Sequence, residues 1–249
     1  MMKGDEVAGS MMEAVDHRLL EVQHTVRSHF GWSYEDDRQS AASLRASMSS
    51  SAPHGVEVWS PLGRRSTYER LVAELMTASK VIVVGAAARP TDVQRAWSNG
   101  CVVVAADGAV GACRDVVDTL CVVTDLDGGE HLQRAAQTGT TLVVHAHGDN
   151  IDRWSACLGS WASQPSPPPL ILSHQTDEMW DDMLNPGGFT DGDRAVCFLL
   201  GAGVATERIC CVGFSSDHVG PWSGVTSPER KLEKLKWMKK ILDWVLPKQ

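Results

Sequence analysis

The sequence predicts an α/β fold in which a mainly parallel sheet is flanked by helices. Short runs rich in valine alternate with segments of helical character between residues 80 and 213. Such alternation is typical of parallel strands joined by right-handed crossovers. The runs are also apolar throughout, as expected of strands that are buried on both faces.

The N-terminal residues 1–54 are predicted to form a small helical appendage to an α/β catalytic domain at 55–249. Apolar residues recur at helical spacing over 13–30, and Ser33 resembles the start of a capping box for a second helix. A Ser-rich stretch at 47–53 is expected to be a linker.

The remaining elements follow from residue pattern and from capping residues. Strands are indicated by β-branched runs, and helices by apolar residues three and four positions apart. Ser66 and Ser227 are the expected N-caps, and the glycine- and acid-rich segment 185–195 is expected to be a loop. The expected strands are 55–59, 80–85, 101–106, 120–124, 141–145, 170–173 and 208–213, and the expected helices are 66–76, 91–99, 130–137, 151–161 and 227–245.

The composition excludes several classes of function. A net charge of −8 over 249 residues argues against a general nucleic-acid binder, which needs a basic face. Since the sequence has no bilayer-spanning apolar stretch and no signal-peptide core, we expect no membrane association. The seven cysteines form no C-x-x-C pair, so we expect free thiols and a cytoplasmic protein.

Acidic residues follow two neighbouring strands of the predicted sheet. Asp125 and Asp127 end one strand, and Asp149 follows the next. Residues i and i+2 of an extended segment point to the same side, so Asp125 and Asp127 can approach one cation. Carboxylates at the carboxyl edge of a sheet suit Mg²⁺ that also binds substrate phosphates. The pattern therefore predicts a metal-dependent enzyme that acts on a nucleotide.

Three further sites have weaker patterns. Asp107 ends another strand, and the turn from Gly85 to Arg89 precedes a helix whose N-terminus attracts anions. This turn is neither a G-x-G-x-x-G motif nor a Walker A loop. His145 and His147 share one side of their strand, which leaves a zinc site open as an alternative, although no third ligand is evident.

Taken together, these segments resemble the archaeal 6-hydroxymethyl-7,8-dihydropterin pyrophosphokinases, which are related in fold to the catalytic domain of thiamin pyrophosphokinase. The family's first glycine loop usually reads G-x-G-P-S-L, whereas this chain has GAAARPT at 85–91, so Arg89 is expected to supply the charge there. The matching motifs occur in consistent order: ADGA (106–109), TDLDG (124–128), HAHGDN (145–150), SHQT (173–176), GGFTDGDRA (187–195) and VGFS (212–215).

The resemblance implies the transfer of a diphosphate from ATP to the hydroxymethyl group of a reduced pterin, with release of AMP and with Mg²⁺ as the metal. Carboxylates facing the acceptor could accept two parallel hydrogen bonds from the amino-pyrimidinone edge of the pterin. The implied metal ligands and catalytic residues are Asp125, Asp127 and Asp149. The implied nucleotide contacts are Gly85, Arg89, Asp107, Gly108, Asn150 and Lys231, and the implied pterin contacts are His147, Gln175, Thr190, Asp191, Asp193 and Arg194.

Other functions on the same scaffold stay open. A thiamin-type pyrophosphokinase or a nucleotide-sugar-dependent transferase would use the same sheet edge. The altered glycine loop leaves room for a non-catalytic nucleotide sensor. In each case the expected partners are small molecules, and a homodimer through the N-terminal helices or the last helix is compatible with the sequence.

Overall fold

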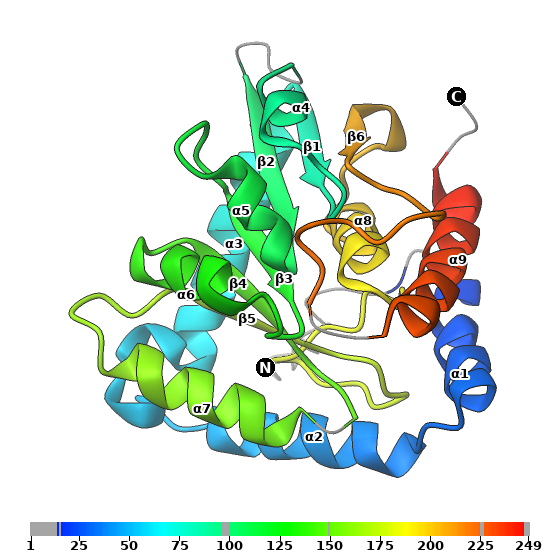
Figure 1. Ribbon diagram of the computed structural model, residues 1–249. Coiled ribbons are helices and arrows are strands. Elements are labelled where there is room, and N and C mark those ends of the chain that lie inside the picture. Colours follow the sequence, from blue (N-terminus) through cyan, green and yellow to red (C-terminus); the bar gives the residue numbers. More distant parts are fainter. Residues whose placement is uncertain (1–13, 15, 96–99, 149, 225–226, 247–249) are drawn as a thin grey trace, which may run out of the picture.

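A six-stranded, all-parallel sheet forms the centre of the molecule, which confirms the predicted fold class (Figure 1). The computed structural model describes residues 14, 16–95, 100–148, 150–224 and 227–246. The strand order is β5-β4-β3-β2-β1-β6. The strands are β1 Lys80–Val84, β2 Cys101–Ala106, β3 Cys121–Thr124, β4 Thr141–Ala146, β5 Leu170–His174 and β6 Ile209–Val212.

The described helices agree with the sequence prediction best where a capping residue marks the start. Ser33 accepts a hydrogen bond from the backbone N–H of Asp36, and Ser227 accepts one from that of Arg230. Both predicted N-caps are therefore confirmed. The helices are α1 Arg18–Phe30, α2 Tyr34–Ser47, α3 Pro61–Thr77, α4 Pro90–Arg95, α5 Val110–Cys113, α6 Gly129–Gln137, α7 Ile151–Ala162, α8 Asp191–Gly201 and α9 Pro228–Val245.

Three predicted elements are wrong. The segment 55–59 forms 3₁₀ turns instead of a strand, because the side chain of Trp59 is buried and its indole donates to the Pro168 carbonyl at 2.7 Å. Helix α3 has its N-cap at Ser60 and begins at Pro61, so the predicted cap Ser66 lies inside the helix. The last residues of the predicted loop 185–195 belong to α8.

The helix predicted at 91–99 is confirmed in its first part only. Helix α4 begins one residue earlier than expected, at Pro90, and is described as far as Arg95. Residues 96–99 lie outside the part of the chain that the structure describes.

Helices cover both faces of the sheet. Helices α4, α5, α6 and α7 pack on one face together with α2, and α3 and α8 pack on the other. Helices α1 and α9 lie outside α8 and share an apolar cluster with it (Figure 1). This coverage explains why most strand residues are buried and why the strands consist mainly of apolar residues.

The N-terminal helices share apolar cores with the rest of the chain. On α2, Ala41 and Leu44 are buried against Leu142 and Trp154. On α1, Leu19 packs in the cluster that also contains residues of α8 and α9. The boundary between residues 54 and 55 stays a prediction. None of the described helices is both long enough and apolar enough to cross a membrane.

Candidate active site

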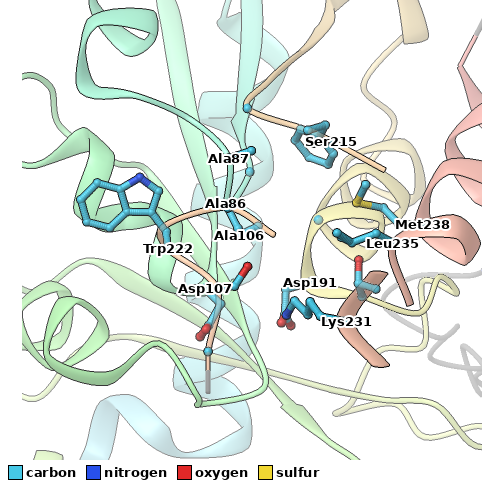
Figure 2. Close-up of a pocket in the computed structure, with 18 of the residues that line it drawn as sticks. Ala86, Ala87, Ala106, Asp107, Asp191, Ser215, Trp222, Lys231, Leu235 and Met238 are labelled. Carbon is cyan, nitrogen blue, oxygen red and sulfur yellow. The ribbon is translucent and has the colours of Figure 1, made fainter. Parts of the chain in front are cut away.

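A cavity lies where the strand order of the sheet reverses. Strand β1 has β2 on one side and β6 on the other, and ligands of open α/β sheets bind outside the carboxyl ends of the strands at such a point. The cavity is lined by Gly85 after β1, Asp107 after β2, Thr190 and Asp191 at the start of α8, and Lys231 on α9 (Figure 2). Several of the residues that the sequence indicated therefore line one cavity.

The cavity has a polar end and an apolar wall. Leu235 and Met238 of α9 form part of the wall, together with Phe214 from the loop after β6. Figure 2 shows Asp191 between Asp107 and the side chains of Leu235 and Met238, with Trp222 on the far side of Asp107. This division suits a ligand that has a charged part and a flat or apolar part. Phe214 belongs to the VGFS motif, whereas Leu235 and Met238 lie in no motif that would have marked them as cavity residues.

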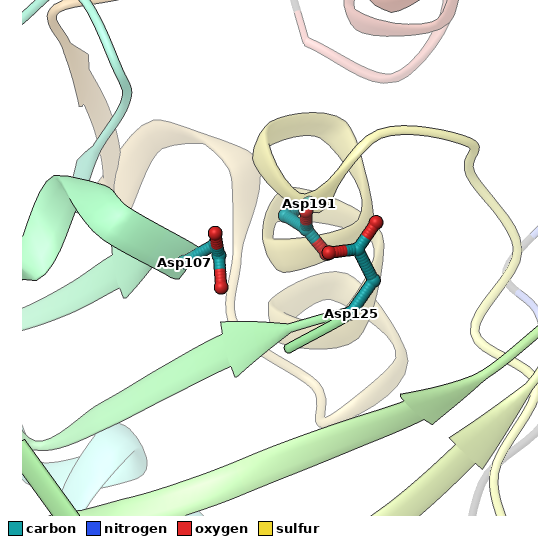
Figure 3. Close-up of side chains that lie close together, drawn as sticks. All are labelled: Asp107, Asp125 and Asp191. Carbon is teal, nitrogen blue, oxygen red and sulfur yellow. The ribbon is translucent and has the colours of Figure 1, made fainter. Parts of the chain in front are cut away.

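Three aspartates converge at the polar end. A carboxylate oxygen from each of Asp107, Asp125 and Asp191 lies within 4.8 Å of the other two (Figure 3). Asp107 follows β2, Asp125 follows β3, and Asp191 is the first residue of α8. Among the described residues, this carboxylate cluster is the group of three or more potential ligands close enough to share one metal ion.

Burial and mutual repulsion shape the charge of this cluster. Burial raises the pKa of Asp107 well above its usual range, and the negative charges of Asp191 and Asp125 raise it further. Burial and Asp125 likewise raise the pKa of Asp191. Burial opposes ionisation of Asp125 too, but its hydrogen bond to His147 and nearby positive charges hold the pKa of Asp125 far below the usual value. Ionisation of Asp107 and Asp191 is therefore unfavourable in this cluster, whereas nearby positive charges stabilise the ionised form of Asp125.

These residues fit a divalent cation. Oδ1 of Asp125 is buried and has no hydrogen-bond partner, which is unusual for a carboxylate oxygen inside a protein. Carboxylate oxygens are the ligands that Mg²⁺ prefers, usually a few of them together with water and substrate phosphates. An oxygen-binding cation would both satisfy the free oxygen of Asp125 and relieve the repulsion among the three carboxylates.

Two of the three predicted metal ligands, Asp125 and Asp127, are described by the structure, and they have different positions. Asp125 is in the carboxylate cluster, whereas Asp127 lines the cavity and lies close enough to Asp107 to raise the pKa of Asp107. Asp127 reaches the cavity although the segment is not extended, because Leu126 between the two acids has a positive φ of 77°. The predicted geometry of this pair is therefore wrong at Leu126. Asp149 lies outside the described residues.

The hydroxyl group of Thr124 links Asp107 to the backbone of the TDLDG turn. Thr124, the last residue of β3, donates to Oδ1 of Asp107 at 2.5 Å and accepts from the backbone N–H of Leu126 at 2.8 Å. Gly128 permits this close arrangement, because a Cβ there would lie 2.8 Å from Oδ1 of Asp107. The TDLDG motif thus positions Asp107 and also contributes Asp125 and Asp127 to the site.

The first turn of α8 holds Asp191. Asp193 closes a capping box by accepting hydrogen bonds from the backbone N–H groups of Phe189 at 2.6 Å and Thr190 at 2.9 Å. Arg194 donates to Oδ1 of Asp191 at 2.9 Å and to the Phe189 carbonyl. Asp193 and Arg194, which we predicted as pterin contacts, are buried in this local network and orient Asp191.

The HAHGDN motif supports Asp125 from the other side. Nε2 of His147 lies 3.3 Å from Oδ2 of Asp125. His145 is buried, and its ring contacts Ser173 at 3.0 Å and Gln175 at 3.3 Å. Burial lowers the pKa of His145 well below its usual value, so this ring is neutral. Because the two histidines have separate partners and no described third ligand, their arrangement gives no support to a zinc site.

Asn150 and Gly108 make contacts within the protein. The amide of Asn150 donates to the His145 carbonyl at 2.8 Å and accepts from the backbone N–H of His147 at 3.1 Å. A Cβ at Gly108 would lie 2.5 Å from the Trp222 carbonyl, so the chain after β6 packs directly against the ADGA turn. Both residues therefore shape the site, whatever else they contact.

Positive charge near the cavity comes from α9. Lys231, predicted as a nucleotide contact, lines the cavity. Lys234, which we did not predict, lies close enough to Asp125 to lower the pKa of that carboxyl. Burial lowers the pKa of Lys234. Its ammonium group also lies 5.1 Å from the centre of the Trp32 ring. Arg89 is 71% exposed and paired with Asp92 at 2.8 Å, and it is not among the residues that line the cavity.

Three archaeal proteins, each named 6-hydroxymethyl-7,8-dihydropterin pyrophosphokinase, are similar to this chain. The Pyrococcus furiosus protein is 37% identical over 150 residues, which cover 57% of this chain and 61% of the relative. The Methanothermobacter thermautotrophicus protein is 32% identical over 166 residues, 61% of this chain and 66% of the relative. The Methanocaldococcus jannaschii protein is 36% identical over 104 residues, 39% of this chain and 40% of the relative.

These similarities confirm the resemblance that the motifs indicated. The chain spans less than two thirds of the length of each of these relatives, between 40% and 66%. No family model matches the chain.

Proposed function

We propose that this chain is a pyrophosphokinase that transfers the β,γ-diphosphate of ATP to 6-hydroxymethyl-7,8-dihydropterin and releases AMP. The names of the similar proteins support this reaction. The observation that carries the proposal is the carboxylate cluster of Asp107, Asp125 and Asp191 beside a cavity at the switch point of the sheet. Phosphoryl transfer depends on such positioning and charge stabilisation more than on covalent help.

We assign the cation to the carboxylate cluster, with Asp127 beside it. Mg²⁺ bound there would neutralise phosphate charge and polarise the β-phosphoryl group. Asp149, although not described by the structure, stays a predicted ligand from the same motif as His147. On this proposal Lys231, which lines the cavity, and Lys234, which lies near Asp125 and Asp191, would contact phosphate oxygens.

The reaction conserves atoms and charge in a single displacement. The hydroxymethyl oxygen forms a bond to the β-phosphorus, and the bond from that phosphorus to the bridging oxygen of the α-phosphate breaks. AMP leaves with that oxygen, and the hydroxyl proton passes to a carboxylate of the cluster. The roles of the protein side chains are to align the two substrates and to bind the negative charge that moves to AMP.

Incubation with ATP, Mg²⁺ and the dihydropterin alcohol tests this proposal by product analysis. AMP and the pterin diphosphate should form with the unchanged protein, and Asp125→Asn should lose the activity. Asp115→Asn is the matched control, since Asp115 is 83% exposed and does not line the cavity. Formation of ADP, or no turnover, would contradict the proposal.

The alternative functions give different results in the same experiment. Turnover of thiamin or of a nucleotide sugar instead of the pterin would indicate another transferase on this scaffold. Binding of ATP without turnover, with Asp125→Asn changing only the affinity, would indicate a sensor. The glycine loop motivates that alternative, because the N–H groups of Ala87 and Ala88 already donate to Gly213 and Gly85 within the protein.

We further propose a cytoplasmic location, supported by the seven cysteines, which form no C-x-x-C pair. We propose that the partners are small molecules. A homodimer stays a prediction.

A further inference from the structure

The carboxylate of Asp37 on α2 connects three distant parts of the chain. It accepts hydrogen bonds from the backbone N–H of Gly148 at 2.6 Å, from Nη1 of Arg27 at 2.9 Å and from the amide of Gln175 at 2.9 Å. Asp37 is only 3% exposed, so water does not compete for these bonds. The residue therefore joins both N-terminal helices to the ends of β4 and β5.

The turn that Asp37 holds is the one that carries His147. Gly148 follows His147 directly, and Nε2 of His147 lies 3.3 Å from Oδ2 of Asp125. A second residue of α2 supports the same turn, because Ser40 donates to Oδ1 of Asn150 at 2.9 Å. Helix α2 thus contacts the turn at two points, Gly148 and Asn150.

Gln175 extends this network to the second histidine of the motif. Its amide nitrogen donates to Asp37, and its amide oxygen contacts Nε2 of His145 at 3.3 Å. Both ends of the Gln175 amide are therefore engaged inside the protein, where the residue is 6% exposed. This arrangement assigns Gln175, which we predicted as a pterin contact, to the support of the HAHGDN motif.

We propose that Asp37 is a positioning residue for the metal site: it holds the His147–Gly148 turn so that His147 keeps Asp125 oriented toward the cation. The proposal rests on the proposed function in taking the carboxylate cluster to bind Mg²⁺. Hydrogen bonds to a buried carboxylate are strong and directional, and outer partners of metal ligands commonly control metal affinity. On this proposal the N-terminal helices help to position the residues of the metal site.

A purely structural role for Asp37 makes a different prediction, and the chain offers a matched control. Arg64 and Asp182 form another ion pair with a buried arginine, at 3.1 Å, and neither residue lines the cavity or contacts the HAHGDN motif. Loss of either ion pair should lower the free energy of unfolding. Only loss of the Asp37 pair should change the metal site.

Binding of Mn²⁺ to the substrate-free protein, measured by the EPR signal of the free ion, tests the proposal. Asp37→Asn should weaken Mn²⁺ binding by about 10-fold or more, whereas Asp182→Asn should bind Mn²⁺ as the unchanged protein does. Circular dichroism establishes that each variant is folded. If Asp37→Asn does not fold, the double variant Arg27→Gln/Asp37→Asn serves instead, because it leaves no unpaired buried arginine.

The His147→Gln background identifies the route. If Asp37 acts through His147, adding Asp37→Asn to His147→Gln should weaken Mn²⁺ binding little further. Unchanged Mn²⁺ affinity in the folded Asp37 variants, effects that multiply with His147→Gln, or no Mn²⁺ binding by the unchanged protein would overturn the proposal. Mn²⁺ binding without AMP formation would instead refute the proposed reaction and leave the role of Asp37 intact.

Discussion

Replacing Asp107 by asparagine should stabilise the metal-free protein and weaken its response to Mg²⁺. Asparagine keeps the shape of the side chain, tolerates the positive φ of 47° at this position and can still accept the hydrogen bond from Thr124. The substitution removes a negative charge that lies within 4.8 Å of carboxylate oxygens of Asp125 and Asp191. The substitution therefore measures how much the repulsion among the three carboxylates lowers the free energy of unfolding.

The size of the effect follows from the separation of the charges. Two unit charges 4.8 Å apart repel by roughly 3 kcal/mol at an effective dielectric constant of about 20. Because burial and the neighbouring acids raise the pKa of Asp107, a proton relieves part of this repulsion in the folded protein. We expect a net gain in the free energy of unfolding of about 1–2 kcal/mol in EDTA at mildly alkaline pH.

Urea unfolding with EDTA and with Mg²⁺ measures both effects. The unchanged protein should gain about 2.7 kcal/mol when Mg²⁺ is at 100 times its Kd, and Asp107→Asn should gain much less at the same concentration. Asp115→Asn is the control, because Asp115 also has a positive φ, of 58°, but is exposed. The reasoning fails if Asp107→Asn is less stable than the unchanged protein in EDTA, or if Mg²⁺ stabilises both equally.

Three other substitutions test separate features. Burial lowers the pKa of His174 to about 4, so the stability that the neutral ring contributes is present above pH 6.5 and lost as the pH falls toward 4. His174→Gln should therefore reduce the loss of unfolding free energy between these pH values, measured by urea unfolding, by roughly 3 kcal/mol. The same pH dependence in both proteins would contradict this. Gly159 is exposed on α7, and a Cβ there would have nothing within 4 Å. Gly159→Ala should therefore raise the free energy of unfolding by about 0.5–1 kcal/mol, and a lower Tm would contradict this. Gly224→Ala would place a Cβ against the carboxylate of Asp127 and displace it. AMP formation should then fall by about 10-fold or more while Tm changes little. Full activity would argue that Asp127 has no role in catalysis.

The sheet was predictable because its residues carry the signal locally. Strands β1 to β5 are largely buried on both faces, so each contains an apolar run that the sequence displays directly. The caps at Ser33 and Ser227 are equally local, since each contacts a residue three positions ahead. The helix start at Ser60 was predictable by the same Ser-Pro pattern as Ser227, but we placed the cap at Ser66.

The composition of the carboxylate cluster depends on contacts that the sequence does not display. Asp191 meets Asp125 only because α8 packs across the sheet, and the capping box from Thr190 to Asp193 was the local signal that could have placed a helix start there. On α2, Asp36 and Asp37 are adjacent acids, yet Asp36 is exposed and Asp37 is buried against Arg27. No local pattern separates them, because the distinction arises from partners far along the chain.

The three carboxylates of the cluster enter the nascent protein at very different times. A chain that has left the ribosome only as far as β5 contains Asp107 and Asp125 but not Asp191 on α8. If the cluster binds a cation as proposed, the three carboxylates come together only when the last third of the protein has packed onto the first two thirds. Metal uptake is on this account a late event in folding, and it favours the completed topology over every truncated one.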